Sequence, residues 1–308
     1  MVSLFLLSLE RFIEYQQVEQ EAKWHEMGDS NLLSKWPSQG AIEFRQASLR
    51  YRPELPRVIH AISFKLIGGS KTGVVGRTGA GKSSLMLLLF RILEPEEGGI
   101  WIDGVNIANV GLHSLRKYLA IIPQDSLLLR GTVRHNLDPF KEKEEHELLH
   151  ALRQVGLYRQ DENLLDRDLS DATAGVSAGE QQLISLARTL LRKEVHICVM
   201  DEPTANIDMA TDETIQKVVR QAFHGITLIT IAHRLNTIID YDNVLVMDSG
   251  KISEFGPGAT LLNDPTSHLS ELATSLGENA ATQLKAKAQQ RRFLSPSAQQ
   301  RRLPALQI

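Results

Sequence analysis

The sequence predicts an α/β fold built around an open, mostly parallel β-sheet. Three observations support this prediction. Residues 195–200 and 226–232 are continuous apolar segments, which are typical of strands buried on both faces of a parallel sheet. Helical patterns lie between such segments, and this alternation is typical of parallel α/β proteins. A further short apolar segment, residues 71–76, runs directly into a series of glycines.

The first 39 residues are expected to form a lead-in to the folded domain. Residues 1–9 are apolar, but Glu10 interrupts them, and a membrane-spanning helix needs about 20 apolar residues. The segment is therefore too short to span a membrane. It lacks a basic start and a cleavage site, so it is not expected to be a signal peptide. It is either a linker or a helical segment that couples the domain to a partner.

Residues 40–276 are expected to form the main domain. An antiparallel β portion is predicted from residue 41, a helix over residues 82–93 and a helical subdomain over about residues 127–193. Residues 277–308 are rich in Ala, Gln, Lys and Arg and contain the repeat AQQRRF and AQQRRL, so we expect a disordered basic tail. Contact of this tail with acidic lipids is the alternative.

The composition limits the classes of partner and compartment. The formal net charge is −3, so the chain lacks the large positive field that attracts nucleic acid. The single cysteine, Cys198, excludes a disulfide within the chain and fits a reducing compartment.

The segment Gly76–Ser83 (GRTGAGKS) matches the phosphate-binding loop GxxxxGK[ST]. Its glycines allow backbone N–H groups to converge on phosphate oxygens. Lys82 supplies a mobile positive charge for the β- and γ-phosphates, and the Ser83 hydroxyl is a ligand for Mg²⁺. The helix predicted after the loop directs its positive end at the same anion.

A second motif, HELLH at residues 146–150, matches the HExxH pattern of zinc proteases. Each pattern arises by chance in a chain of this length on the order of 1% of the time, so the surroundings must decide between them. The phosphate loop lies between a strand and a helix, and the downstream strand ends in Asp201 and Glu202, where a parallel sheet delivers catalytic groups. HELLH lies in a charged amphipathic segment without a clear third ligand. Its two histidines are therefore expected to be exposed on a surface helix.

These segments together resemble the ABC (ATP-binding cassette) ATPase family, and closely the second nucleotide-binding domain of its C subfamily, the multidrug-resistance-associated type. The resemblance covers about residues 7–275 and implies a P-loop NTPase core of the RecA-like type. The segments that carry it are LERFIEY (9–15), WPSQGAIEF (36–44), LRYRPELPRVIHAISF (49–64), VGRTGAGKSSL (75–85), residues 102–140, DEPTANID (201–208) and residues 229–256.

The resemblance implies roles for individual residues. Tyr51 matches the aromatic that stacks on adenine, and Gln124 matches the loop glutamine that joins the Mg²⁺ shell and faces the transmembrane domains. Asp201 matches the acid that holds Mg²⁺ through water, Glu202 matches the general base, and His233 matches the histidine that contacts the γ-phosphate. The loop residues expected to bind ATP are Gly76, Arg77, Thr78, Gly79, Ala80, Gly81, Lys82, Ser83 and Ser84.

The segment Val176–Glu180 (VSAGE) departs from the family signature, LSGGQ or LSVGQ. Ser177 and Gly179 agree with it, but Glu180 replaces a neutral amide. In the family this signature contacts ATP held by a partner domain in a head-to-tail dimer, and Asp208 matches the loop that crosses to that partner. A carboxylate close to a triphosphate is unfavourable unless it points away. We therefore expect a competent site in this chain and a weakened one in its partner.

The function that the resemblance implies is that of an ATP-binding and ATP-hydrolysing motor domain of an ABC exporter, with ATP and Mg²⁺ as its ligands. It would associate with the cytoplasmic face of a membrane through transmembrane domains and would pair with a second nucleotide-binding domain. A regulatory ATP-binding module that gates a channel is the alternative. A soluble ABC ATPase that acts on ribosomes or DNA fits less well, because such proteins generally lack the LERFIEY lead-in.

Overall fold

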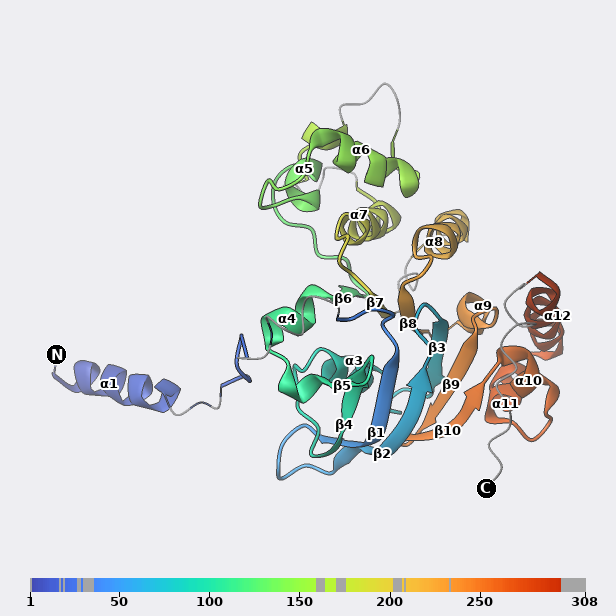
Figure 1. The fold of residues 1–308 in the computed structure, drawn as a ribbon, viewed down its shortest axis with the longest axis horizontal. Coiled ribbons are helices and arrows are strands. Elements are labelled where there is room, and N and C mark those ends of the chain that lie inside the picture. The colour runs from blue at the N-terminus through green and yellow to red at the C-terminus, as the bar shows by residue number, and fades with distance from the viewer. Residues whose placement is uncertain are drawn as a thin grey trace.

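The computed structural model describes residues 2–16, 18, 20–26, 29, 36–158, 164–169, 176–201, 207, 209–232 and 234–294. Two β-sheets form the centre of the molecule, and one group of helices lies apart from the others above them in Figure 1. The sequence-based prediction of a mixed α/β fold is confirmed.

The larger sheet has six strands in the order β10–β9–β3–β8–β7–β6. Among these strands, neighbouring pairs are parallel except β9 and β10 at one edge. The strands are β3 Lys71–Gly76, β6 Leu119–Ile122, β7 Ile197–Asp201, β8 Thr227–Ile231, β9 Asn243–Asp248 and β10 Lys251–Gly256. The central position of β3 places the phosphate-loop sequence, which follows it, at the middle of the sheet's carboxyl edge.

The continuous apolar character of these strands follows from burial on both faces. Val74 and Val75 of β3 are 1% and 2% exposed, although their side chains point in opposite directions. Val74 packs in the core between the two sheets, and Val75 packs in the core beneath the helices. Cys198 of β7 is fully buried in that second core, and its burial raises the pKa of the thiol to about 12.

The smaller sheet is antiparallel, with the order β2–β1–β4–β5. Its strands are β1 Ile42–Arg50, β2 Arg57–Leu66, β4 Glu97–Ile102 and β5 Val105–Asn106, followed by the short helix η1 Ile107–Asn109. Helix α3, Lys82–Leu89, contributes Leu85, Leu88 and Leu89 to the core between the two sheets. The antiparallel portion predicted from residue 41 is thus present and supports one side of α3.

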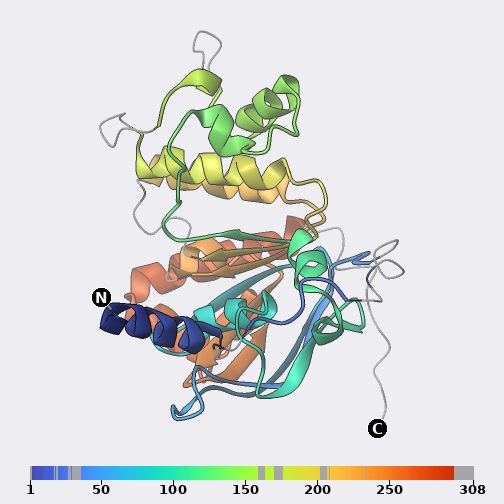
Figure 2. The same cartoon turned by 90° about the vertical axis from the view of Figure 1, so that its left-hand side faces the viewer.

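The predicted helical subdomain is the upper group of helices in Figure 1. It contains α5 Val133–Leu137, α6 Glu145–Gln154, η2 Leu164–Asp166 and α7 Ala178–Leu190. Helix α7 lies beside α8, Met209–Ala222, as Figure 2 shows. Helix α9, Leu235–Ile238, follows β8 at the sheet.

The lead-in contains a helix and an ordered contact with the domain. Helix α1, Val2–Gln16, extends away from the sheets, and Phe12 and Tyr15 on it are 69% and 76% exposed. Residues 20–26 then lie against α4, Leu112–Lys117. The backbone N–H groups of Leu112 and His113 each donate a 3.0 Å hydrogen bond to this segment. The buried Asp29 carboxylate accepts from the Ser114 hydroxyl at 2.7 Å and from the Gly111 N–H at 3.2 Å, at the start of α4.

The segment that leads into β1 is held by an anchor formed around Asp103, in the turn between β4 and β5. Its carboxylate accepts hydrogen bonds from the four successive backbone N–H groups of residues 38–41, at 2.7–3.0 Å. Trp36 is buried and donates from Nε1 to the Ile102 carbonyl at 2.8 Å. Asp103 and Trp36 together fix the chain where the predicted lead-in meets the predicted domain.

The carboxyl-terminal part differs from the expectation of a disordered tail beginning at residue 277. Helix α12, Glu278–Leu294, packs with α10, Gly258–Asn263, and α11, His268–Ser275. Leu284 and Ala288 are 1% and 4% exposed in the same core as the sheet. These two apolar side chains lie one helical turn apart, so a mostly polar sequence still docks. Residues 295–308 lie outside the described residues.

Among the described helices, none combines the length and the apolar character needed to cross a bilayer.

Candidate functional site

The phosphate-loop sequence connects the end of β3 to the start of α3. Gly76 has φ +150°, and a Cβ on it would lie 2.2 Å from the Met247 carbonyl oxygen. Gly81, the N-cap of α3, has φ +96°, and a Cβ there would lie 2.7 Å from the Ile59 side chain. Glycine is required at both positions because side chains are disfavoured there by conformation and by space. The loop therefore turns tightly between β3 and α3. The N-terminus of α3, with the backbone N–H groups of its first turn, follows the loop directly, which is the arrangement that binds phosphate in other proteins.

Lys82 is the first residue of α3, and it is only 6% exposed. Its Nζ donates to the carbonyl oxygens of Gly76 and Arg77, at 2.9 and 3.1 Å. Burial lowers the pKa of Lys82, and the Asp201 carboxylate at the end of β7 opposes that shift. The structure thus brings together a phosphate-type loop after β3, a lysine that lies over it and an acid at the end of β7, which is separated from β3 by β8 alone.

Tyr51 lies directly after β1, and 43% of it is exposed. Its hydroxyl shares a 3.0 Å hydrogen bond with Ser84 Oγ, in the first turn of α3. This bond holds the tyrosine next to the loop and leaves part of the ring open to solvent. An aromatic ring in this place suits stacking against a flat base.

The remaining predicted binding residues differ in their exposure to solvent. Arg77, Thr78, Gly79 and Ser83 are exposed, whereas Ala80 and Ser84 are buried. Gln124 is exposed and follows β6, separated from the strand by Pro123. Glu202, His233 and Asp208 were predicted from the sequence, but they lie outside the described residues.

The signature-like segment begins α7. The Ser177 hydroxyl accepts from the Glu180 N–H, and the Glu180 carboxylate accepts from the Ser177 N–H, both at 3.1 Å. This reciprocal pair is a capping box, which satisfies two N–H groups at the start of the helix. The pattern Ser-x-x-Glu at residues 177–180 is the local sequence signal for this capping box.

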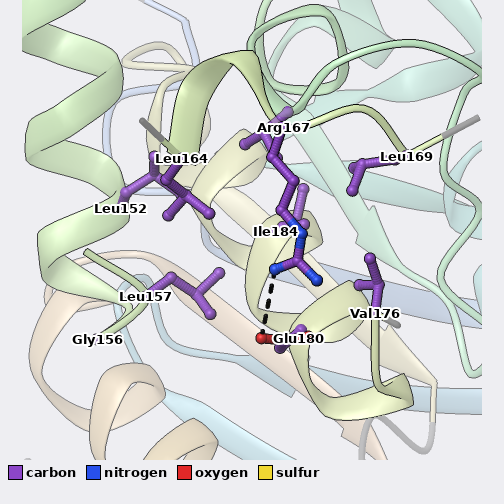
Figure 3. Close-up of a pocket in the computed structure, with 10 residues that line it drawn as sticks. Leu152, Gly156, Leu157, Leu164, Arg167, Leu169, Val176, Glu180 and Ile184 are labelled. Carbon is purple, nitrogen blue, oxygen red and sulfur yellow. Dashed lines mark ion pairs between the residues drawn. The ribbon is translucent and has the colours of Figure 1, made fainter. Parts of the chain in front are cut away.

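The Glu180 carboxylate also forms an ion pair with Arg167, at 3.8 Å, as Figure 3 shows. The pair lies beside a hollow of about 130 Å³ in the helical subdomain. Apolar side chains line most of this hollow: Leu152, Leu157, Leu164, Leu169, Val176 and Ile184. Glu180 is thus held by its own helix and by a cation of the same subdomain.

Comparison with known proteins places these features in a family. Residues 59–205 match the family described as ABC transporter. ATP-binding cassette sub-family C member 4 of Homo sapiens is 43% identical over 292 residues, which are 94% of this chain and 22% of that protein. Sub-family C member 3 of Homo sapiens is 48% identical over 260 residues, which are 83% of this chain and 17% of that protein.

The chain carries an ABC-transporter domain homologous to those of sub-family C.

A solved structure agrees with this assignment. A bacterial Atm1-family ABC exporter with ATP bound superposes with a TM-score of 0.78 at 29% identity, covering 89% of this chain and 47% of that chain. The chain therefore spans about a fifth of the length of the sub-family C relatives and about half of this exporter chain. The ABC-transporter match includes the phosphate loop, Gln124, the signature-like segment and Asp201. ATP binding is the shared property of such domains.

The HELLH motif has a structural role in this ABC-transporter domain. It lies on α6, where His146 and His150 are exposed. Glu147 completes a capping box by accepting from the Glu144 N–H, and it pairs with Lys193 at 2.6 Å. Within the part of the chain that the structure describes, no group of three side chains suits a metal ion. The expectation of two exposed histidines on a surface helix is confirmed.

Proposed function

We propose that this chain is the ATP-binding and ATP-hydrolysing motor domain of an ABC exporter. The observation that carries this proposal is the convergence of the glycine loop, Lys82 and Asp201 at the carboxyl edge of the parallel sheet. Ligands of open α/β sheets bind at this edge. The domain would act at the cytoplasmic face of a membrane through transmembrane domains and in a pair with a second nucleotide-binding domain.

The residues of the site support binding of a triphosphate. Backbone N–H groups at the start of α3 and the positive helix end favour phosphate. Lys82 now bonds to two carbonyl groups of its own loop, and a phosphate would replace these neutral acceptors with a charged one. Tyr51 would stack on the base from the other end of the site.

The residues also suit Mg²⁺, because the exposed Ser83 hydroxyl, the Asp201 carboxylate and the exposed Gln124 side chain are all oxygen donors. When bound, Mg²⁺ supplies charge neutralisation at the phosphates. Lys82 would add to this neutralisation as negative charge develops on the γ-phosphate oxygens.

Hydrolysis needs an oriented water, and we assign this task to Glu202, which follows Asp201 in the sequence. Its carboxylate would accept a proton from the water as the water oxygen bonds to the γ-phosphorus and the bond to the ADP oxygen breaks. His233 would donate to the γ-phosphate. General-base catalysis contributes about 10²–10⁴-fold to a rate.

The test combines equilibrium binding of a fluorescent ATP analogue with phosphate release by the same 308-residue chain. Glu202→Gln should retain binding and lose phosphate release by about 10²–10⁴-fold, whereas Lys82→Ala should weaken binding itself. Unchanged phosphate release in Glu202→Gln would remove that residue from the mechanism. Binding without phosphate release in the unaltered chain, at concentrations where two copies associate, would favour the regulatory alternative.

The same proposal includes an unequal pair of ATP sites. The Glu180 carboxylate lies at the N-terminal end of α7, where it accepts the Ser177 N–H. In the head-to-tail arrangement, this helix end would face the γ-phosphate bound by the partner domain. A carboxylate already placed there would compete with that phosphate, and Arg167 would offset only part of its charge.

Glu180→Gln tests this part of the proposal, because glutamine also completes a capping box while it removes the charge. In the pair of domains, the variant should lower the ATP concentration at which the second site is half occupied. Unchanged binding at that site would show that Glu180 does not weaken it.

A further inference from the structure

Helix α7 holds the segment around Gln124 through a buried amide. Gln182, one helical turn after Gly179, is 2% exposed. Its Oε1 accepts from the Ser126 hydroxyl, and its Nε2 donates to the Pro123 carbonyl at 3.3 Å. These two partners stand on either side of Gln124 and Asp125, so one side chain brackets the segment.

A second contact from the same helix fixes the far end of the segment. Arg188 donates from Nε to the Asn136 carbonyl at 2.7 Å and from Nη2 to Asn136 Oδ1 at 3.2 Å. The Asn136 side chain is fully buried. It accepts from the Leu129 N–H at 2.7 Å and donates to the Leu129 carbonyl at 2.9 Å. The segment from Pro123 to Leu129 is therefore attached to α7 at both ends.

The attachment matters because the Gln124 side chain is exposed. Its position then depends on the backbone on either side of it. Gln182 uses both halves of its amide on that backbone, and an unpaired buried amide is unfavourable. A shift of the first turns of α7 would therefore move Pro123 and Ser126 with Gln182, rather than break the two bonds.

We propose that Gln182 is a positioning residue for Gln124. Its two hydrogen bonds couple the start of α7 to the Gln124 segment, so that the two move together. This inference rests on the proposed function, in which Gln124 serves the Mg²⁺·ATP of this chain and Ser177 and Gly179 serve the ATP of the partner. Occupation of the partner's ATP site would thus be transmitted to Gln124 through the bracket formed by Gln182.

The experiment measures binding of a fluorescent ATP analogue to the 308-residue chain, with Mg²⁺ and with excess chelator. Gln182→Leu keeps the size of the side chain and removes both hydrogen bonds. We expect about a 10-fold weaker affinity with Mg²⁺, as for other residues that orient a metal ligand, and an unchanged affinity with chelator. Gln181→Leu, at the next position of the same helix, is the matched control and should change neither affinity.

Two further measurements separate positioning from a general structural effect. Amide hydrogen exchange of residues 123–130, without nucleotide, should become faster in Gln182→Leu and stay unchanged in the control. In a Gln124→Ala background, Gln182→Leu should produce no additional loss of Mg²⁺-dependent affinity, because its target is absent. Ser126→Ala removes one of the two bonds to Gln182 by a change at a partly buried side chain. It should show the same selective effect with a smaller size, even if Gln182→Leu does not fold.

The outcomes distinguish the inference from the function on which it rests. Binding by the unaltered chain that does not depend on Mg²⁺ would contradict the proposed function. Mg²⁺-dependent binding that is equal in the unaltered chain and in the folded Gln182→Leu and Ser126→Ala variants would overturn the inference alone. An equal additional loss in the Gln124→Ala background would also overturn it, because Gln182 would then act by another route.

Discussion

Asp103→Asn should destabilise the domain through the anchor at its first strand. The carboxylate of Asp103 accepts four backbone N–H groups, three at Oδ2 and one at Oδ1. Asparagine has one acceptor oxygen in its side chain, so at least one backbone N–H of residues 38–41 would face the side-chain NH₂ group of the asparagine. It tolerates the positive φ of 47° at this turn, so the backbone itself is not strained.

The size of the effect follows from the difference between charged and neutral acceptors. A hydrogen bond to a charged group contributes about 1.5–3 kcal/mol and a neutral one about 0.5–1.5 kcal/mol, and an unpaired N–H costs about 1–3 kcal/mol. Solvent screening reduces these values because the Asp103 site is partly exposed. We therefore expect Asp103→Asn to lower the free energy of unfolding by about 2–3 kcal/mol at pH 7.

The effect should also depend on pH in a defined direction. Partial burial raises the pKa of Asp103, but its hydrogen bonds from residues 38–41 outweigh burial and leave the pKa below its usual value. A lowered pKa means that the charged form stabilises the fold. This contribution is complete above the unfolded pKa of about 3.9 and is lost as the pH falls through the folded pKa. The difference between the variant and the unaltered chain should therefore shrink below about pH 4.

Urea unfolding followed by tryptophan fluorescence provides the assay, because Trp36 is part of the same anchor. Asp264→Asn is the control: its carboxylate is exposed and, among the residues that the structure describes, accepts from Thr266 alone, so a much smaller change is expected. A loss in Asp103→Asn below about 1 kcal/mol at pH 7, or a loss of equal size at pH 3.5 and pH 7, would refute the reasoning.

Three other predictions follow from single side chains. Leu88→Ala removes a fully buried residue between the two sheets and should cost about 2–5 kcal/mol in urea unfolding; a smaller loss would mean that this core closes around the cavity. Tyr51→Phe loses the bond to Ser84 but keeps the ring, so its ATP affinity should fall by less than about 10-fold, whereas Tyr51→Ala should lose more; equal losses in a titration would argue against stacking. The double variant His146→Ala, His150→Ala should change the free energy of unfolding by less than about 0.5 kcal/mol. Zinc found in the unaltered chain by elemental analysis would contradict the structural role of HELLH.

The sheet and the phosphate loop were predictable because their signals are local. Residues 71–83 contain an apolar strand, the glycines of a tight loop and the lysine in one stretch of sequence. The loop around Lys82 and its closeness to Asp201 follow from that stretch and from the rule that parallel strands end at one edge. HELLH is equally local, and only its charged surroundings showed that it belongs to a surface helix.

Other features were not predictable because their partners are distant in sequence. Asp103 bonds to N–H groups 62–65 residues earlier, and Gln182 bonds to residues 56 and 59 positions earlier. No short pattern marks either carboxylate or amide as an anchor. Helix α12 was not expected because its mean hydropathy is low and, among its residues with described burial, Leu284 and Ala288 are the two that are buried in the core. The capping box at residues 177–180 differs from these cases, since its pattern, Ser-x-x-Glu, is local in the sequence.

The burial of Cys198 has a practical consequence. Cys198 is the only cysteine in the sequence, and its side chain on β7 is fully buried in the core. Burial raises the pKa of the thiol, so little of the reactive thiolate forms at neutral pH. We therefore expect the unaltered chain to react poorly with maleimide dyes. Two cysteines introduced at the exposed positions of Leu127 and Phe140 would accept a donor and an acceptor fluorophore without competition from Cys198. Movements of the Gln124 segment and of the helical subdomain are thus open to distance measurements by energy transfer in an otherwise unaltered protein.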